Sequence, residues 1–167
     1  FLWDPDNDFV RCQKLAFEYA EVIGRDIVAH EWEATDGAVE WLKLLRKYEV
    51  PCLLCSPFDV YTPEQALEKA NLAGLIDVAV TSEDGCETAE QAFLLGCLKI
   101  HRPPSRVVAF VDEPTDVMAA LDAYLKPVAV YGKFPAYEMR PAYSKIPSLG
   151  DLTVMSMREF FADEPPR

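Results

Sequence analysis

Short apolar runs that alternate with helical segments constrain the fold of this chain more than any other feature. Each run is apolar without interruption, which is typical of strands that are buried on both faces of a sheet. Strands are predicted over residues 50–56, 77–81, 106–111 and 127–131, with a weak strand after residue 145. The segments between them carry apolar residues at helical spacing. Helices are predicted over residues 9–24, 37–48, 62–74, 89–99, 116–125 and 155–161.

This order of elements predicts the fold class. Strands that are separated by helices, without hairpin signals, indicate βαβ units. We therefore predict a three-layer, Rossmann-like α/β fold with a parallel sheet and helices on both faces. Residues 1–162 are expected to form one domain, and the Pro-rich residues 163–167 a frayed tail. Asp8 and Asp36 are the candidate N-caps of the first two helices.

The charge and the cysteines exclude several classes of protein. The net charge of −12, from 28 acidic and 16 basic residues, argues against a nucleic-acid partner. No apolar run approaches the roughly 20 residues that cross a bilayer, so no transmembrane segment is expected. The five cysteines favour a reducing compartment, such as the cytoplasm or an organelle interior. Cys52 and Cys55 have a redox spacing but lie in a strand instead of opening a helix, so a redox role is not expected.

Acidic and hydroxyl side chains follow three of the apolar runs. In an open parallel sheet, ligands bind outside the carboxyl ends of the strands. Carboxylates together with one hydroxyl suit Mg²⁺, which takes one or two carboxylates plus phosphate oxygens and water. The candidate catalytic residues are Asp4, Asp6 and Ser56, and the candidate Mg²⁺ ligands are Asp4, Asp112 and Asp116.

The order of these segments resembles the haloacid dehalogenase (HAD) superfamily. Residues 36–47 are similar to the Pro-Gly-Val helix of that family, and residues 72–84 to the stretch before its motif III. Residues 50–56 look like motif II, and the resemblance implies that Ser56 hydrogen-bonds a phosphoryl group. Residues 107–116 look like the acidic motif IV, and the resemblance implies that Asp112 and Asp116 hold Mg²⁺.

The first motif of the family is matched only in part. HAD enzymes use an aspartate nucleophile and a second aspartate as general acid, and the resemblance assigns these roles to Asp4 and Asp6. Asn7 stands where the family has Gly, and Pro5 removes a backbone donor that would hold phosphoryl oxygens. An acidic loop that caps the first helix is an equally weighted alternative for this segment.

Two further departures weaken the resemblance to an active enzyme. The family places a Lys-Pro pair where this chain has Glu87 and Thr88, and Glu87 adds a like charge that opposes phosphate binding. Lys99 lies at the far end of the next helix, about 15 Å along its axis, and is not expected to substitute. The lid of capped relatives is also missing, since only about 30 residues separate Asp6 from Gly37.

Three functional hypotheses follow. The first is a degenerate, capless HAD-like domain that has lost catalysis and serves as an interaction or structural subunit of a larger assembly, with Trp32 as a candidate anchor for other protein subunits. The second is a Mg²⁺-dependent HAD phosphatase that acts on a small phosphorylated substrate. The third is a domain that binds Mg²⁺ or a phosphorylated ligand without turnover. The sequence favours the first, because an acidic pocket without a balancing ammonium group should repel a phosphate ester.

Overall fold

Strands and helices alternate along the chain. The computed structural model describes residues 10–15, 17–19, 22, 33–56 and 63–161. The strands are β1 (Leu53–Ser56), β2 (Val78–Thr81), β3 (Val108–Val111), β4 (Lys126–Val130) and β5 (Ser144–Ile146). The helices are α2 (Ala38–Lys47), α3 (Pro63–Lys69), α4 (Ala89–Lys99), α5 (Pro114–Asp122) and α6 (Val154–Glu159), with 3₁₀ turns η1 (Ser82–Asp84), η2 (Pro104–Arg106) and η3 (Leu149–Asp151). The described residues between 10 and 22 are also helical, inside the helix predicted over residues 9–24.

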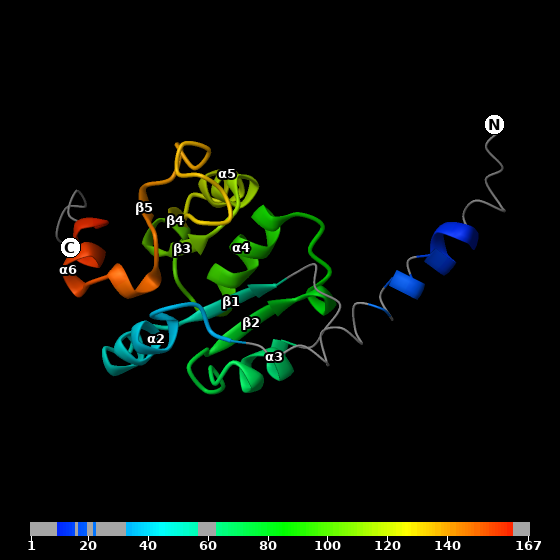
Figure 1. Cartoon of the computed structure of the whole chain (residues 1–167), viewed down its shortest axis with the longest axis horizontal. Helices are drawn as coiled ribbons and strands as arrows, with labels where there is room; N and C mark the ends of the chain where they lie inside the picture. Colours follow the sequence, from blue (N-terminus) through cyan, green and yellow to red (C-terminus); the bar gives the residue numbers. More distant parts are fainter. Residues whose placement is uncertain (1–9, 16, 20–21, 23–32, 57–62, 162–167) are drawn as a thin grey trace.

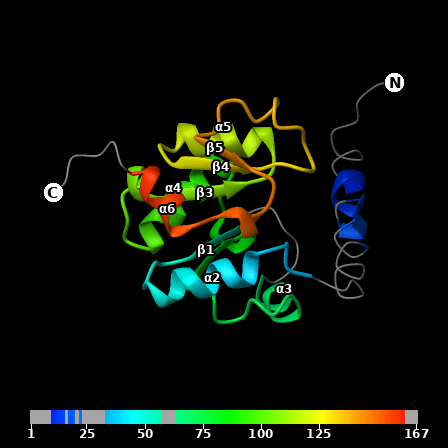
Figure 2. The same cartoon turned by 60° about the vertical axis from the view of Figure 1, so that its left-hand side comes forward.

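All described strand pairs are parallel. β1 pairs with β2, and Ser56 lies opposite Thr81. β3 pairs with β4, which pairs in turn with β5, and Val111 lies opposite Ala129. The described strands therefore form two sheets, one of two strands and one of three, and Figure 2 shows β1 below β3, β4 and β5. The predicted α/β fold with parallel strands is confirmed.

Helices cover both faces of the strands. α4 contacts β1 and β2, α5 contacts β3 and β4, and the two helices pack against each other. α2 lies on the other side of β1 from α4 (Figure 1). Gly96 allows α4 to approach β1 closely, since a Cβ atom at this position would lie 2.3 Å from Cδ2 of Leu53. The core between α4, α5, β3 and β4 is rich in small side chains such as Ala120 and Ala123, which are fully buried.

Several element ends differ from their predicted positions for local reasons. The helix predicted over residues 62–74 ends at Lys69, and Asn71 follows with a left-handed φ of 57° that a helix cannot continue through. α5 begins at Pro114, two residues before its predicted start, because proline suits the first turn of a helix. The strand predicted over residues 50–56 begins only at Leu53, after Pro51.

The predicted N-cap of α2 is wrong. Gly37, with a φ of 75°, occupies the cap position, and no side chain caps the helix. The Asp36 carboxylate instead accepts a hydrogen bond from Oγ of Ser148 at 2.9 Å. This bond ties the start of α2 to η3, 112 residues further along the chain. A local pattern cannot reveal such a partner.

Candidate functional site

The predicted site residues that the structure describes lie at the carboxyl ends of the strands. Ser56 is the last residue of β1 and is 8% exposed. Asp112 follows β3 directly, and Asp116 lies in the first turn of α5. A cavity between β1 and β3 is lined by Asp112 and Asp116 from one side and by Cys55 from the other. The structure thus brings motif-IV-like carboxylates near the end of the motif-II-like strand.

Asp116 stands in a strongly acidic environment. Burial raises the pKa of its carboxyl group, and the negative charges of Glu113 and Asp112 raise it further. The same charges reach across to β1, because Asp116 also contributes to the raised pKa of the Cys55 thiol. A bound cation would relieve the repulsion between the negative charges gathered here.

Lys133 is the functional candidate that sequence reasoning missed. It lies three residues after β4 and forms an ion pair with Glu113. Its ammonium group lowers the pKa of Asp116, and the hydrogen bond to Glu113, supported by the charges of Asp112 and Asp116, raises the pKa of Lys133. Its position after a predicted strand could have indicated that it lies near the acidic residues, because the carboxyl ends of neighbouring parallel strands share one edge of the sheet. The structure thus places one ammonium group beside the acidic residues that follow β3.

The structure does not describe the other proposed members of the site. Asp4 and Asp6 lie outside the described residues, as do Trp32 and the tail at residues 163–167. Within residues 33–56 and 63–161, no group of three or more His, Cys, Asp or Glu side chains is arranged to hold a metal ion. Asp112 and Asp116 thus form a carboxylate pair and not a complete cage.

The region that replaces the family's Lys-Pro pair is a helix cap. Thr88 is the N-cap of α4, and its hydroxyl accepts a hydrogen bond from the backbone N–H of Gln91 at 3.2 Å. Lys99, at the other end of α4, donates to both carboxylate oxygens of Asp84 at 2.7 Å and to the carbonyl of Ala79 at 3.0 Å. Lys99 is therefore held at β2 by Asp84.

None of the five cysteines forms a disulfide bond in the described part of the chain. All five are free thiols, and Cys52 is buried in the segment that leads into β1. Burial is the main cause that raises the pKa of Cys55 to about 12. A thiol with such a pKa is almost entirely protonated at neutral pH and is a poor nucleophile.

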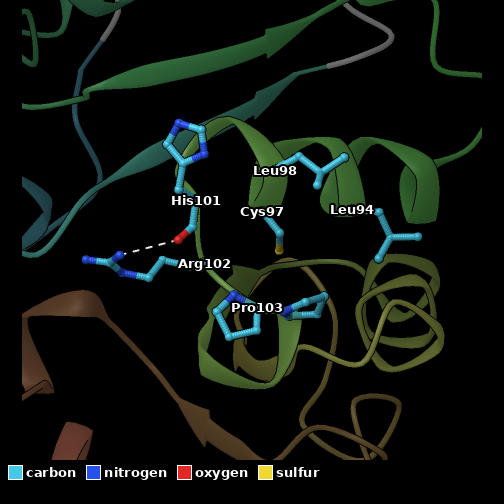
Figure 3. A pocket seen from close by; sticks show the side chains of 7 residues that line it. Leu94, Cys97, Leu98, His101, Arg102 and Pro103 are labelled. Atoms are coloured by element: carbon cyan, nitrogen blue, oxygen red, sulfur yellow. Dashed lines mark hydrogen bonds between the residues drawn. The ribbon is translucent and has the colours of Figure 1, made fainter.

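A second cavity lies away from this edge. It has a volume of about 430 Å³ and is lined by residues at the end of α4 and in the turn before β3. Figure 3 shows His101 and Arg102 at its rim, where Arg102 donates to the carbonyl of His101 at 3.3 Å, and Cys97 and Leu98 at its wall. These residues precede β3, so the cavity lies at the amino ends of the strands. Its lining is mostly apolar and includes no carboxylate.

The described helices give no sign of membrane insertion. None of them has both the length and the apolar composition that a membrane span requires.

Comparison with known proteins finds one curated relative and several solved structures that are similar to this chain. No protein-family model matches it. A 5-amino-6-(5-phospho-D-ribitylamino)uracil phosphatase, chloroplastic, of Arabidopsis thaliana is 26% identical over 155 residues, which are 92% of this chain. The chain spans only 41% of the length of that relative.

Solved structures with a similar fold include one protozoan and one bacterial protein. A HAD hydrolase of family IA, variant 3, from Entamoeba histolytica matches with a TM-score of 0.76 and 15% identity, covering 96% of this chain and 74% of that one. A β-phosphoglucomutase from Clostridium difficile matches with a TM-score of 0.74 and 13% identity, covering 96% and 70%. At this identity the likeness concerns the fold.

These comparisons correct the preferred functional prediction. The expectation that the chain has lost catalysis and serves as an interaction or structural subunit is wrong, because the similar proteins are a phosphatase and a phosphoglucomutase. Lys133 also places an ammonium group beside the acidic residues after β3, which the sequence-based argument did not include.

Proposed function

Because the chain has the fold of the HAD superfamily, we propose that it is a Mg²⁺-dependent phosphatase that acts on a small phosphorylated substrate. The observation that carries this proposal is that Asp112 and Asp116 line a cavity that also reaches Cys55, directly before Ser56 at the carboxyl end of β1. A phosphate monoester of a small polar molecule is the substrate class. The named substrate of the Arabidopsis relative, which carries a 5-phospho-D-ribityl group, belongs to this class. The free cysteines support a reducing compartment.

The resemblance to the superfamily supplies the roles of the residues. The Asp4 carboxylate attacks the phosphorus atom, and Asp6 donates a proton to the ester oxygen that leaves. Water then hydrolyses the aspartyl phosphate and releases inorganic phosphate. Ser56, held at the end of a buried strand, donates a hydrogen bond to a phosphoryl oxygen. The altered first motif and the missing lid stay predictions.

The described carboxylates fit Mg²⁺. Asp112 and Asp116 offer hard oxygen donors that would hold the ion, and their mutual repulsion, which contributes to the raised pKa of Asp116, would favour binding of a dication. Mg²⁺ commonly takes one or two carboxylates and completes its shell with water and substrate phosphate, so a complete protein cage is not required. When bound, it would neutralise negative charge on the phosphoryl oxygens.

Lys133 takes the place of the family's missing lysine in this proposal. It reaches the acidic residues from the loop after β4 and not from the start of α4. Its ammonium group offsets the charges of Glu113 and Asp116, which lowers the cost of bringing a phosphate dianion to this edge.

Hydrolysis of an aryl phosphate tests the proposed function. We expect the native chain to release phosphate with Mg²⁺, and we expect EDTA to abolish turnover. Asp4→Asn should reduce turnover to the level measured without protein, because an amide is a far weaker nucleophile than a carboxylate. Asp26→Asn, in the predicted link, is the matched control and should keep full activity. Mg²⁺ or phosphate binding without any turnover would contradict the phosphatase proposal.

Removal of the Lys133 charge tests its role separately. Lys133→Gln should lower kcat/KM by about tenfold, less than the loss of a buried donor costs, because the side chain is more than half exposed. Lys133→Arg keeps the positive charge. Its loss in kcat/KM should therefore diminish at low ionic strength. Lys43→Gln, an exposed lysine on α2, should leave kcat/KM unchanged. Equal kinetics for the Lys133→Gln and Lys43→Gln proteins would remove Lys133 from the site.

A further inference from the structure

Glu113 and Lys133 form an ion pair beside the carboxylates that line the cavity. Glu113 directly follows Asp112, and its carboxylate accepts a hydrogen bond from the ammonium group of Lys133. This bond raises the pKa of Lys133, and the charges of Asp112 and Asp116 raise it further. Asp112 and Asp116 both line the cavity at the carboxyl ends of the strands. A phosphate that binds at this edge therefore meets both members of the ion pair.

The Glu113 carboxylate does not cap the helix that it precedes. Glu113 is the N-cap residue of α5, but its side chain forms no capping hydrogen bond. Pro114 follows in the first turn of the helix and has no backbone N–H group that a cap would satisfy. The carboxylate is 39% exposed and is bound by Lys133 instead. Its role is therefore tied to Lys133 and not to the start of α5.

The loop that carries Lys133 has contacts of its own. The backbone N–H of Gly132 donates to the carbonyl of Phe134 at 3.2 Å, which closes a turn around Lys133. Phe134 packs against the core, and the Lys133 ammonium group lies 5.8 Å from the centre of the Phe134 ring. Loss of the Glu113 carboxylate should therefore release the ammonium group but leave the loop in its place.

We propose that Glu113 competes with phosphate for the ammonium group of Lys133, so that this ion pair regulates how tightly the site holds phosphate. The inference rests on the proposed function for its ligand, which is the phosphoryl group of the substrate or the inorganic phosphate product. The Lys133 side chain is 56% exposed, and water screens such a pair, so one carboxylate holds the ammonium group only weakly.

A phosphate dianion can take the ammonium group from Glu113. It carries twice the charge of a carboxylate and offers more acceptor oxygens for charge-assisted hydrogen bonds. When the phosphate leaves, Glu113 binds Lys133 again, which makes release of the product easier. Glu113 thus lowers the affinity for phosphate although it lies beside the cation that attracts it.

A double-mutant cycle tests the competition. Calorimetric titration with inorganic phosphate at a fixed Mg²⁺ concentration measures the Kd of the native chain and of the Glu113→Gln, Lys133→Gln and doubly substituted proteins. We expect Glu113→Gln alone to lower the Kd by about fivefold, the scale of a surface ion pair. When Lys133→Gln is also present, Glu113→Gln should lower the Kd by less than about twofold, because only the repulsion by an exposed carboxylate is removed.

NMR spectroscopy follows the ammonium group without any need for turnover. Titration of the native chain with phosphate should shift the signal of the Lys133 methylene group next to the ammonium nitrogen, assigned from the Lys133→Gln protein. Glu159→Gln is the matched control, because it removes one exposed carboxylate at the end of α6. The next residue, Phe160, accepts a hydrogen bond from Lys126 at the amino end of β4, so Glu159 lies at the opposite ends of the strands. The control should keep the native Kd.

Four outcomes would overturn the proposal. Glu113→Gln could weaken phosphate binding or leave it unchanged, or it could lower the Kd equally with and without Lys133, which would make Glu113 only a repelling charge. Phosphate could leave the Lys133 signal unmoved, or it could fail to bind the native chain. If phosphate binds with the expected Glu113 effect but no aryl phosphate is hydrolysed, the proposed function fails alone. Turnover without the Glu113 effect would exclude only the competition.

Discussion

Asp112→Asn should lower Mg²⁺-dependent hydrolysis of an aryl phosphate by at least about 100-fold, the scale on which preorganised electrostatic stabilisation contributes to rate. The substitution keeps the shape of the side chain but removes one of two negative charges in the carboxylate pair with Asp116. A neutral amide binds Mg²⁺ more weakly than a carboxylate does, so the activity should recover in part when the Mg²⁺ concentration is raised. Initial rates over a Mg²⁺ titration measure both effects.

A loss of activity in the Asp112→Asn protein could also come from unfolding. The environment of Asp112 allows the two causes to be distinguished. Asp112 is exposed, and its charge contributes to the raised pKa of Asp116. Removal of that charge lowers the pKa of Asp116 toward its ordinary value, and the melting temperature without Mg²⁺ should stay the same or rise. Asp122→Asn makes the same change at the exposed end of α5 and should keep full activity. Equal Mg²⁺ dependence in the two variants would exclude Asp112 from the metal site.

Gly37→Ala should destabilise the fold by about 2–4 kcal/mol, as a left-handed backbone and a steric clash act together. The φ of Gly37 is +75°, which disfavours any residue with a Cβ atom. An added Cβ would also lie 2.1 Å from the backbone nitrogen of Gly150 in η3. Backbone cannot rotate away as a side-chain end can, so α2 or η3 must move. Denaturant unfolding that follows circular dichroism measures the change in free energy.

A second glycine separates the two causes. Gly74 has nearly the same φ, +74°, but an added Cβ would meet no atom within 4 Å. Gly74→Ala should therefore cost only the conformational part, about 1 kcal/mol. If both variants lose the same free energy of unfolding, the close approach of Gly37 to Gly150 contributes nothing to stability.

Much of the fold and part of the site could be predicted from local patterns. Continuous apolar runs placed β2, β3 and β4 to within two residues, and the helix over residues 89–99 was predicted with the bounds of α4. Ser56 and Asp112 could be predicted at one edge because each follows a buried run, and the carboxyl ends of parallel strands meet.

The sequence by itself determined the order of strands and helices and the carboxylates at the strand ends. Burial on both faces and the end of a strand each produce a sequence pattern within a few residues. Only the tertiary structure decided that Lys133 pairs with Glu113, that Ser148 holds Asp36, and that a cavity separates β1 from β3. Ion pairs, close backbone approaches and cavities depend on distances between residues that are far apart in the chain. A local sequence pattern contains no information about such distances.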